Sequence, residues 1–196
     1  TTYLVTADNE QDSISFRAQF RFAGENGTTL VLSSPGYISF DGMEVPADSS
    51  KYEGAYYEKH FHKDGFAGNH SIIYTDLNGN QHKEEFKFHK ITCSEDFAAV
   101  SKKKNWVIHL SGADEADKVD VSISDTSLSN NAIELKDVQA AKPITISADQ
   151  LKELKTGPLE IEIKQTKEIP LKNATQEGGT FQLFYHIKTI RTELKE

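Results

Sequence analysis

Hydrophobic and polar residues alternate along much of this chain. The clearest run spans nine residues, with apolar side chains at Ile14, Phe16, Ala18, Phe20 and Phe22 and a polar residue between each pair. A period of two is typical of a strand that buries one face and exposes the other. The run predicts an antiparallel strand whose five apolar side chains, including that of Phe22, point inward.

The stretch from residue 71 to 88 predicts a β-hairpin, because β-forming residues lead into a turn at 76–79 and an alternating segment leads out. A two-residue turn would place Ile72 opposite Glu85, whereas a three-residue loop pairs Asp76 with Asn80. The three-residue loop brings four apolar side chains to one face, namely Ile72, Tyr74, Phe86 and Phe88. A slip of one residue would turn every side chain to the other face. We therefore predict the three-residue loop, with Gly79 at positive φ.

Other short strands are predicted on both sides of the hairpin, at residues 3–5, 28–32, 37–40, 106–110, 119–123, 133–135, 144–146, 159–163 and 180–194. Between residues 43 and 68 the alternation is weaker, and this region predicts one strand flanked by long loops. Residues 147–155 predict a helix of one or two turns. Its cap is expected at Ser147 or Ala148, with Gly157-Pro158 beyond its end.

A polar, charged run at residues 101–105 interrupts the pattern near the middle of the chain. A length of 196 residues suits two domains of about 100 residues each. We therefore predict an all-β protein of two tandem antiparallel β-sandwich domains, residues 1–98 and 99–196, joined near residues 97–105. The one short helix belongs to the second domain.

Two patterns in the chain resemble those of bacterial immunoglobulin-like modules. One is the hairpin Tyr74-Thr75-Asp76-x-Asn78-Gly79, and the other is Ile144-x-Ile146-Ser147-x-Asp149-x-Leu151 followed by Gly157 and Gly178-Gly179. Such modules are common in exported and lipoprotein-anchored proteins of Gram-negative bacteria. The resemblance implies tandem immunoglobulin-like sandwiches and an extracytoplasmic location in the periplasm, at the cell surface or secreted. It carries over no binding residue, because folds of this class host many activities.

Charge and composition limit the classes of partner that the protein can have. A formal net charge of −8 gives the protein no overall attraction to polyanions, so we expect no nucleic-acid partner. No run reaches the roughly 18 apolar residues of a membrane span, so no transmembrane segment is predicted. The chain begins at Thr1, and we consider both a trimmed chain and a removed export signal, with a lipid anchor upstream of Thr1 as one form of the latter. Cys93 is the only cysteine, so an internal disulfide cannot form.

The sequence has no recognised catalytic or cofactor motif: no nucleophile elbow, zinc-protease helix, phosphate loop or dinucleotide-binding glycine pattern. The loop that begins at Asp76 does not fit the EF-hand calcium loop. Its glycine, Gly79, stands at the fourth position instead of the sixth, and Lys87 stands at the twelfth position, where a Glu ligand is required. We therefore predict a non-enzymatic protein without a cofactor. A hydrolase whose carboxylates converge only in the folded chain is one alternative.

Aromatic and histidine residues collect between residues 52 and 66, and five of them are candidate ligand-binding residues: Tyr52, Tyr56, Tyr57, His60 and His62. The rings either present faces to a sugar or peptide or fill the sandwich core. His60 and His62 share one face of a strand, where they either belong to a zinc or copper site or stand on a solvated face.

The preferred function is an exported binding or adhesion module that acts through loops and a sheet edge, with a protein or glycan ligand that the sequence does not identify. A small-ligand or metal-binding protein that uses the region of Tyr56, Tyr57, His60 and His62 is the other alternative.

Overall fold

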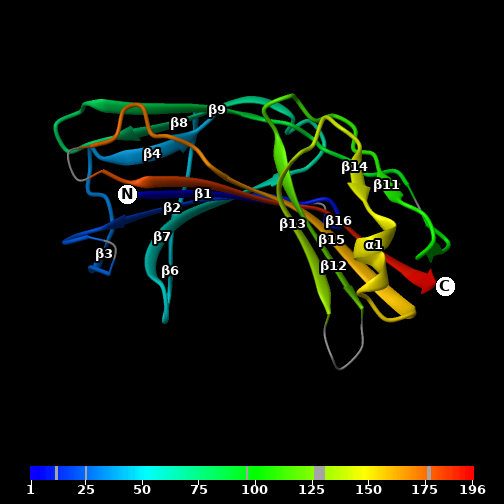
Figure 1. The fold of residues 1–196 in the computed structure, drawn as a ribbon. Helices are drawn as coiled ribbons and strands as arrows, with labels where there is room; N and C mark the ends of the chain where they lie inside the picture. The colour runs from blue at the N-terminus through cyan, green and yellow to red at the C-terminus, as the bar shows by residue number, and fades with distance from the viewer. Residues whose placement is uncertain (12, 25, 96, 126–130, 176–177) are drawn as a thin grey trace. The chain divides into compact units, whose positions relative to one another are not determined.

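A computed structural model describes the chain except for residues 12, 25, 96, 126–130 and 176–177 (Figure 1). The strands are β1 (Thr2–Asp8), β2 (Ser13–Arg21), β3 (Thr29–Leu30), β4 (Tyr37–Phe40), β5 (Met43–Glu44), β6 (Ala47–Ser50), β7 (Gly54–His62), β8 (Gly68–Thr75), β9 (Gln81–Phe88), β10 (Val100–Ser101), β11 (Trp106–Ile108), β12 (Lys118–Asp125), β13 (Ala132–Gln139), β14 (Ile144–Ile146), β15 (Gly157–Glu168) and β16 (Thr180–Lys195). One short helix, α1 (Ala148–Lys152), joins β14 to β15. The fold is therefore all-β with one short helix, as predicted. Among the described residues, no helix has the length and apolar character to cross a membrane.

The described residues pack into two compact units. Unit 1 comprises residues 1–88 and 167–184, and unit 2 comprises residues 89–166 and 185–196. The strands β15 and β16 therefore contribute residues to both units. These units do not follow the consecutive segments 1–98 and 99–196, and that division into domains stays a prediction.

Unit 1 contains two antiparallel sheets of immunoglobulin-like order. One sheet runs β1-β2-β7-β6, with residues 180–184 of β16 beside β1 and β3 beside the end of β2, and the other runs β5-β4-β8-β9. These are the A-B-E-D and C′-C-F-G orders of an immunoglobulin-like sandwich. Phe40 lies in the core of the unit, and its ring centroid lies 4.8 to 6.1 Å from those of four other phenylalanines, Phe16, Phe61, Phe66 and Phe86.

Unit 2 has the sheet β13-β12-β15-β16, with β10 parallel to β16, and a second sheet formed by β11 and β14. These strands follow the C′-C-F-G-A′ and B-E orders, and α1 occupies the E–F connection. Ser147 caps the helix: its side chain accepts from the Gln150 N–H, and the Gln150 side chain accepts from the Ser147 N–H. This reciprocal capping box confirms the predicted helix start.

The β8–β9 hairpin has the predicted register. The Asp76 N–H donates to the Asn80 carbonyl and the Gly79 N–H to the Asp76 carbonyl, both at 3.0 Å. Gly79 has φ +81°, a conformation that glycine adopts without steric cost. The three-residue loop is confirmed, and Ile72, Phe86 and Phe88 are buried on one face with Tyr74 half-buried beside them.

Other predictions were wrong in detail. Residues 43–68 contain three strands, β5, β6 and β7, in place of one strand with long loops; β6 is an edge strand without apolar alternation. Residues 133–135 belong to the longer strand β13. Phe22 is 70% exposed, because β2 ends at Arg21 and Phe22 lies outside the strand.

Candidate functional site

One end of unit 1 collects exposed apolar side chains. Among the described residues, eight large apolar side chains are exposed, and six of them lie at this end. These six residues, which we call the loop end, are Phe22, Leu30, Val31, Tyr37, Tyr52 and Leu77. Exposed apolar side chains scattered singly are normal, but a gathering of them on neighbouring loops marks an interaction surface.

Strand register places the connections that carry these residues at the same end of their strands. At the end of β2, Phe20 pairs with Leu30 of β3, and its ring centroid lies 4.8 Å from that of Tyr74 near the end of β8. The Thr29 hydroxyl accepts a hydrogen bond of 2.8 Å from the Ala55 N–H, which ties β3 to the start of β7. The connections β2–β4, β6–β7 and β8–β9 therefore leave the strands at the same end of the unit. In the immunoglobulin-like order they are the B–C, D–E and F–G connections.

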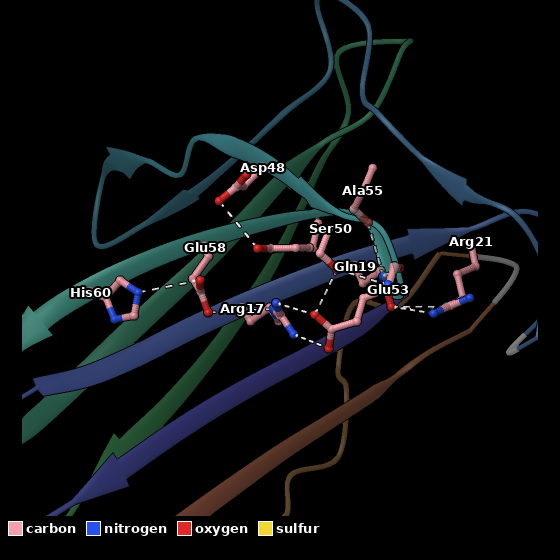
Figure 2. A network of polar contacts seen from close by, with 10 residues as sticks. Arg17, Gln19, Arg21, Asp48, Ser50, Glu53, Ala55, Glu58 and His60 are labelled. Carbon is pink, nitrogen blue, oxygen red and sulfur yellow. Dashed lines mark hydrogen bonds and ion pairs between the residues drawn. The ribbon is translucent and has the colours of Figure 1, made fainter.

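The β6–β7 turn presents Tyr52, which is 92% exposed, and a polar network holds the turn in place (Figure 2). The Arg17 guanidinium donates two hydrogen bonds, of 2.9 and 3.0 Å, to the Glu53 carboxylate. The Gln19 amide donates to the Glu53 carbonyl at 2.8 Å, and the Glu53 N–H donates to the Ser50 hydroxyl at 3.0 Å. Paired donors of this kind fix geometry as well as adding energy, so Tyr52 stands on a well-defined turn.

The B–C connection is held to the body of the unit in a similar way. The Leu32 N–H donates to the Tyr57 hydroxyl at 2.7 Å, which fixes the chain next to the exposed Val31. The Arg21 guanidinium donates to the Gly27 carbonyl at 2.9 Å. These contacts reduce the conformational entropy that this long connection would lose on binding a partner.

The F–G loop is ordered by one carboxylate. Asp76 accepts hydrogen bonds from the Asn78 and Asn80 N–H groups at 2.8 and 2.9 Å, and from the Asn80 side-chain amide at 3.0 Å. This arrangement holds the loop so that Leu77 is 62% exposed at its tip, beside Gly36 of the B–C connection. All three connections thus carry an exposed apolar side chain on a backbone fixed by side-chain hydrogen bonds.

The same hydrogen bonds act on the acidity of two carboxylates. The hydrogen bond from Arg17 lowers the pKa of Glu53, and the hydrogen bond from the Asn80 side chain lowers the pKa of Asp76. A hydrogen bond to the charged form favours that form. Both carboxylates are therefore ionised at neutral pH, when they hold their turns.

The structure does not bring the five predicted ligand-binding residues together. Tyr52 stands at the loop end, whereas Tyr56 is buried on the outer face of β7 under Arg17, whose guanidinium carbon lies 3.8 Å from the ring centroid. Tyr57 points to the opposite side of β7 and is buried, with its hydroxyl bound to Leu32. Its ring belongs to the core, as one of the two interpretations predicts. Joint ligand binding by the five residues stays a prediction.

His60 and His62 do share the outer face of β7, as their spacing predicts, and both are exposed. The nearest carboxylate to His60 is that of Glu58 at 3.6 Å, and the His62 ring accepts a hydrogen bond from the Asp64 N–H at 3.2 Å. Within the described part of the chain, no group of three or more His, Cys, Asp or Glu side chains is arranged to hold a metal ion.

A shallow depression of about 530 Å³ lies on the outer face of β8 and β9. His70 lines it, but both ring nitrogens are engaged: Nδ1 lies 2.7 Å from an Asp41 carboxylate oxygen and Nε2 lies 2.6 Å from the Phe66 carbonyl oxygen. Lys83 and Glu85 form an ion pair at its rim. A histidine held at both nitrogens is poorly placed to act as a base or a ligand. The depression is therefore a weaker candidate for a functional site than the loop end.

Buried carboxylates have structural partners. Glu84 in unit 1 accepts the N–H groups of Lys172 and Asn173 at 2.8 and 2.6 Å. In unit 2, Asp125 accepts the Lys155 N–H at 3.0 Å, and Asp117 holds His89. These carboxylates satisfy backbone or ring donors, as buried charges must.

Of the six loop-end residues, only Tyr52 is among the candidate ligand-binding residues that the sequence predicts. Phe22 continues an alternating pattern and was therefore expected inside, and Leu77 is a single apolar residue among turn residues. The signal that could have found them is an apolar residue next to turn formers, in several predicted loops of one domain. Only the strand order shows that those loops share an end.

No protein-family model matches the sequence, and no curated protein matches it. Solved structures with some similarity include a tetra-tandem repeat in the extending region of a large adhesion protein (15% identity, 99% of this chain and 48% of that one, TM-score 0.33). Another is SGBP-B of the Bacteroides ovatus mixed-linkage glucan utilization locus, in complex with a mixed-linkage heptasaccharide. The two share 11% identity over 97% of this chain and 43% of that one, with a TM-score of 0.29. A third comprises fibronectin(III)-like modules of Clostridium thermocellum CbhA, with 11% identity over 96% of this chain and 90% of that one and a TM-score of 0.26.

This chain spans less than half the length of the first two of these structures. All three TM-scores lie below 0.5.

Proposed function

We propose that this protein is a non-enzymatic binding or adhesion module that engages its ligand with the loop end of unit 1. The observation that carries the proposal is that six of the eight large exposed apolar side chains in the described part of the chain lie on, or directly next to, three connections at the same end of the unit. Binding residues are found disproportionately on loops that a rigid scaffold positions. A sandwich with ordered loops at one end is such a scaffold.

Three side chains stand out as anchors because each projects from a different connection: Phe22 (70% exposed), Tyr52 (92%) and Leu77 (62%). Each follows or precedes a charged residue that is hydrogen-bonded within the unit, namely Arg21, Glu53 and Asp76. Apolar side chains on a fixed backbone lose little entropy on binding, which raises affinity for a given contact area. We refer to Phe22, Tyr52 and Leu77 as the loop-end anchors.

An extracytoplasmic location in the periplasm, at the cell surface or secreted belongs to the same proposal. Its support is the resemblance of the hairpin and helix-cap patterns to exported immunoglobulin-like modules. Attachment through a lipid upstream of Thr1 is part of this proposal and is tested by radiolabelled fatty-acid incorporation in the native host. Localisation by fractionation with an antibody against the folded chain tests the location directly.

Substitution of the anchors tests the proposed site. Labelled full chain is applied to intact cells of the source organism and to panels of immobilised extracellular proteins and glycans. We expect Leu77→Ser and Tyr52→Ala each to weaken binding about tenfold or more, since a single anchor commonly contributes more than about 1.4 kcal/mol. Met43→Ser is the matched control, because Met43 is 44% exposed and pairs with Phe40, at the end of β4 away from Tyr37.

If binding is unchanged by both anchor variants and weakened by Met43→Ser, the site assignment is wrong. Circular dichroism of each variant shows whether any loss reflects unfolding, and substitutions at exposed positions should change stability by no more than about 0.5 kcal/mol.

A further inference from the structure

We propose that His70 and Asp41 form a pH-sensitive latch in unit 1, which is closed while the His70 ring carries a proton on both nitrogens. The latch joins three segments of the unit: His70 belongs to β8, Asp41 to the turn between β4 and β5, and Phe66 to the connection between β7 and β8. The His70 side chain is only 8% exposed. The latch is a property of unit 1 itself and does not depend on ligand binding at the loop end.

Both atoms that face the His70 ring nitrogens are hydrogen-bond acceptors. Nδ1 lies 2.7 Å from a carboxylate oxygen of Asp41, and Nε2 lies 2.6 Å from the carbonyl oxygen of Phe66. Neither a carbonyl oxygen nor an ionised carboxylate has a proton to donate. A neutral imidazole has one N–H group and one lone pair, so one of the two contacts would place a lone pair against an oxygen atom. The imidazolium form has two N–H groups and satisfies both contacts.

Three phenylalanine rings pack near the His70 ring and favour the same charged form. The Phe66 ring is stacked on it, with 4.1 Å between the centroids and 22° between the ring planes. The centroids of Phe40 in β4 and Phe86 in β9 lie 5.4 and 5.2 Å away. An aromatic ring attracts a cation, and the attraction strengthens where water is excluded. The rings therefore add to the preference for imidazolium that the two acceptors create.

Asp41 supplies the charge in direct contact with the His70 ring. On the outer face of β8 and β9, Lys83, Glu85 and Lys87 line the same depression as His70. Lys83 and Glu85 pair with each other at 2.6 Å, and Lys87 is exposed, so solvent screens these charges. The side chains that β4, β9 and the β7–β8 connection pack against the ring are uncharged phenylalanines. The charge balance at His70 therefore depends chiefly on Asp41.

Asp41 also holds the turn in which it stands. Its second carboxylate oxygen accepts a hydrogen bond of 2.7 Å from the Ser71 N–H, and its own N–H donates to the Ser71 carbonyl at 2.9 Å. Asp41 has φ +49°, a left-handed conformation that is uncommon for residues other than glycine. A neutral His70 ring gives up one of its two contacts, whereas the contacts between Asp41 and Ser71 need no proton from the ring. The latch therefore opens without melting the β4–β5 turn.

The direction of the pH effect follows from the charged form. Histidine side chains exchange this proton in the range of about pH 5 to 8. The latch stabilises unit 1 on the acidic side of this range, where imidazolium is populated, and its contribution is lost as pH rises. His62 in the same unit gives a contrast, because its Nδ1 accepts the Asp64 N–H at 3.2 Å and must offer a lone pair to do so. His62 is therefore suited to the neutral form and His70 to the charged one.

NMR of the full chain tests the protonation of His70 directly. Two-bond ¹H–¹⁵N spectra distinguish a ring nitrogen that carries a proton from one that does not. At about pH 7 we expect protons on both ring nitrogens of His70 and none on Nδ1 of His62. As the pH is raised to about 9, His70 should lose one proton, and the Ser71 amide signal should shift with the same midpoint, because Ser71 contacts the other oxygen of Asp41.

Asp41→Asn tests the partner of the ring. The Asn side-chain oxygen can accept the Ser71 N–H while its amide donates to Nδ1, which leaves Nε2–H for the Phe66 carbonyl. A neutral ring then has both contacts satisfied. Asn also tolerates positive φ, so the turn is kept. We expect the His70 ring to be neutral at about pH 7 in this variant.

The same variant shows whether the latch stabilises unit 1. Urea unfolding is followed through a methyl signal of Ile72, which is fully buried in this unit. From about pH 6 to about pH 8.5, the unfolding equilibrium constant of the unsubstituted chain should rise about tenfold more than that of Asp41→Asn, because a hydrogen bond to a charged group is lost. His82 and His89 also face carboxylates, but both chains keep them, so their contributions cancel in the comparison.

Asp64→Asn is the matched control, because the Asp64 carboxylate lies 3.6 Å from the exposed ring of His62. It should leave the protonation of His70 and the pH dependence of unfolding as they are in the unsubstituted chain. A neutral His70 ring at about pH 7 in the unsubstituted chain would overturn the proposal. A charged ring or an unchanged pH dependence in Asp41→Asn would overturn it as well. If Asp41→Asn does not fold, the titration of the unsubstituted chain decides, and a Ser71 amide signal that does not move with His70 rules out the latch.

Discussion

Glu84 shows how much a single residue decides in unit 1. Its side chain is 4% exposed on the inner side of β9, opposite Ile72, and it accepts the N–H groups of Lys172 and Asn173. The Asn173 amide adds a hydrogen bond of 2.6 Å to the Lys83 carbonyl on the same strand. Because β9 is the last strand of its sheet, this contact covers an edge that would otherwise be open to pairing with another chain.

Replacing Glu84 with Ala should lower the free energy of unfolding by about 2–4 kcal/mol, because two backbone donors lose a charged acceptor in a buried place. Urea denaturation followed by circular dichroism measures the change. Glu85→Ala is the matched control: Glu85 is the next residue, its side chain is 62% exposed, and its loss should cost no more than about 0.5 kcal/mol. Equal effects of the two substitutions would show that the Glu84 contacts contribute nothing.

A second prediction at this scale concerns pH. Because Arg17 lowers the pKa of Glu53 and Asn80 lowers that of Asp76, the stabilisation from these carboxylates is present above their ordinary values, about 4.3 and 3.9, and is lost as pH falls through the lowered values. NMR titration of the side-chain carboxyl carbons should show both midpoints below the ordinary ones. In Arg17→Met, only the Glu53 midpoint should return to its ordinary value; a shift of both would contradict the assigned causes.

At the scale of elements, the β8–β9 hairpin links local sequence to the proposed site. Its register is set because Ile72 and Phe86 must both lie on the buried face of the sheet. That register in turn requires a loop of three residues. The loop then places Leu77 at the tip, in the F–G position. Turn chemistry therefore determines where an anchor stands, although turn chemistry alone carries no function.

Gly79→Ala should destabilise the protein by about 1–2 kcal/mol, because a residue with a Cβ is strained at φ +81°. Space is not the obstacle, since nothing lies within 4 Å of the added methyl group. Asn78→Ala is the control in the same loop, because the Asn78 contact with Asp76 is made by its backbone N–H. Thermal unfolding of the two variants measures the difference, and equal midpoints would argue against strain at Gly79.

At the scale of the whole molecule, unit 1 is built from two distant parts of the chain. Phe181 is fully buried, with its ring centroid 5.1 Å from that of Phe86 and 6.1 Å from that of Tyr3. The Thr180 N–H donates to the Thr1 carbonyl at 2.9 Å. Residues 167–184 therefore contribute a side chain to the core of unit 1 and also cover the edge of its β9 strand.

A fragment of residues 1–98 should consequently lack a cooperative unfolding transition, because it loses Phe181 from its core and leaves Glu84 buried without its donors. A chain in which residues 1–88 are joined to 167–184 by a Gly/Ser linker should regain that transition. Calorimetry and NMR peak dispersion measure both. A fragment 1–98 that unfolds at the full chain's temperature would support the division into consecutive domains.

Local physics made a large part of this fold predictable. The alternation of Ile14 to Phe20, the hairpin register and the Ser147 cap all depend on residues that are neighbours in sequence. Strand β6 was missed because it is an exposed edge strand, and exposed strands carry no apolar alternation. Tyr52 was found for its aromatic ring and not for its position.

The sequence by itself determined that the chain is all-β, which residues lie on the same face of each strand with apolar alternation, and how the hairpin turns, because periodicity and turn chemistry act over a few residues. Only the tertiary structure decided that residues 167–184 complete unit 1 and that Phe22, Tyr52 and Leu77 stand at one end. Alternation gives the side of a sheet on which a side chain lies, but not whether another part of the chain covers it. Phe20 is covered and Phe22 is not, because β2 ends at Arg21 between them.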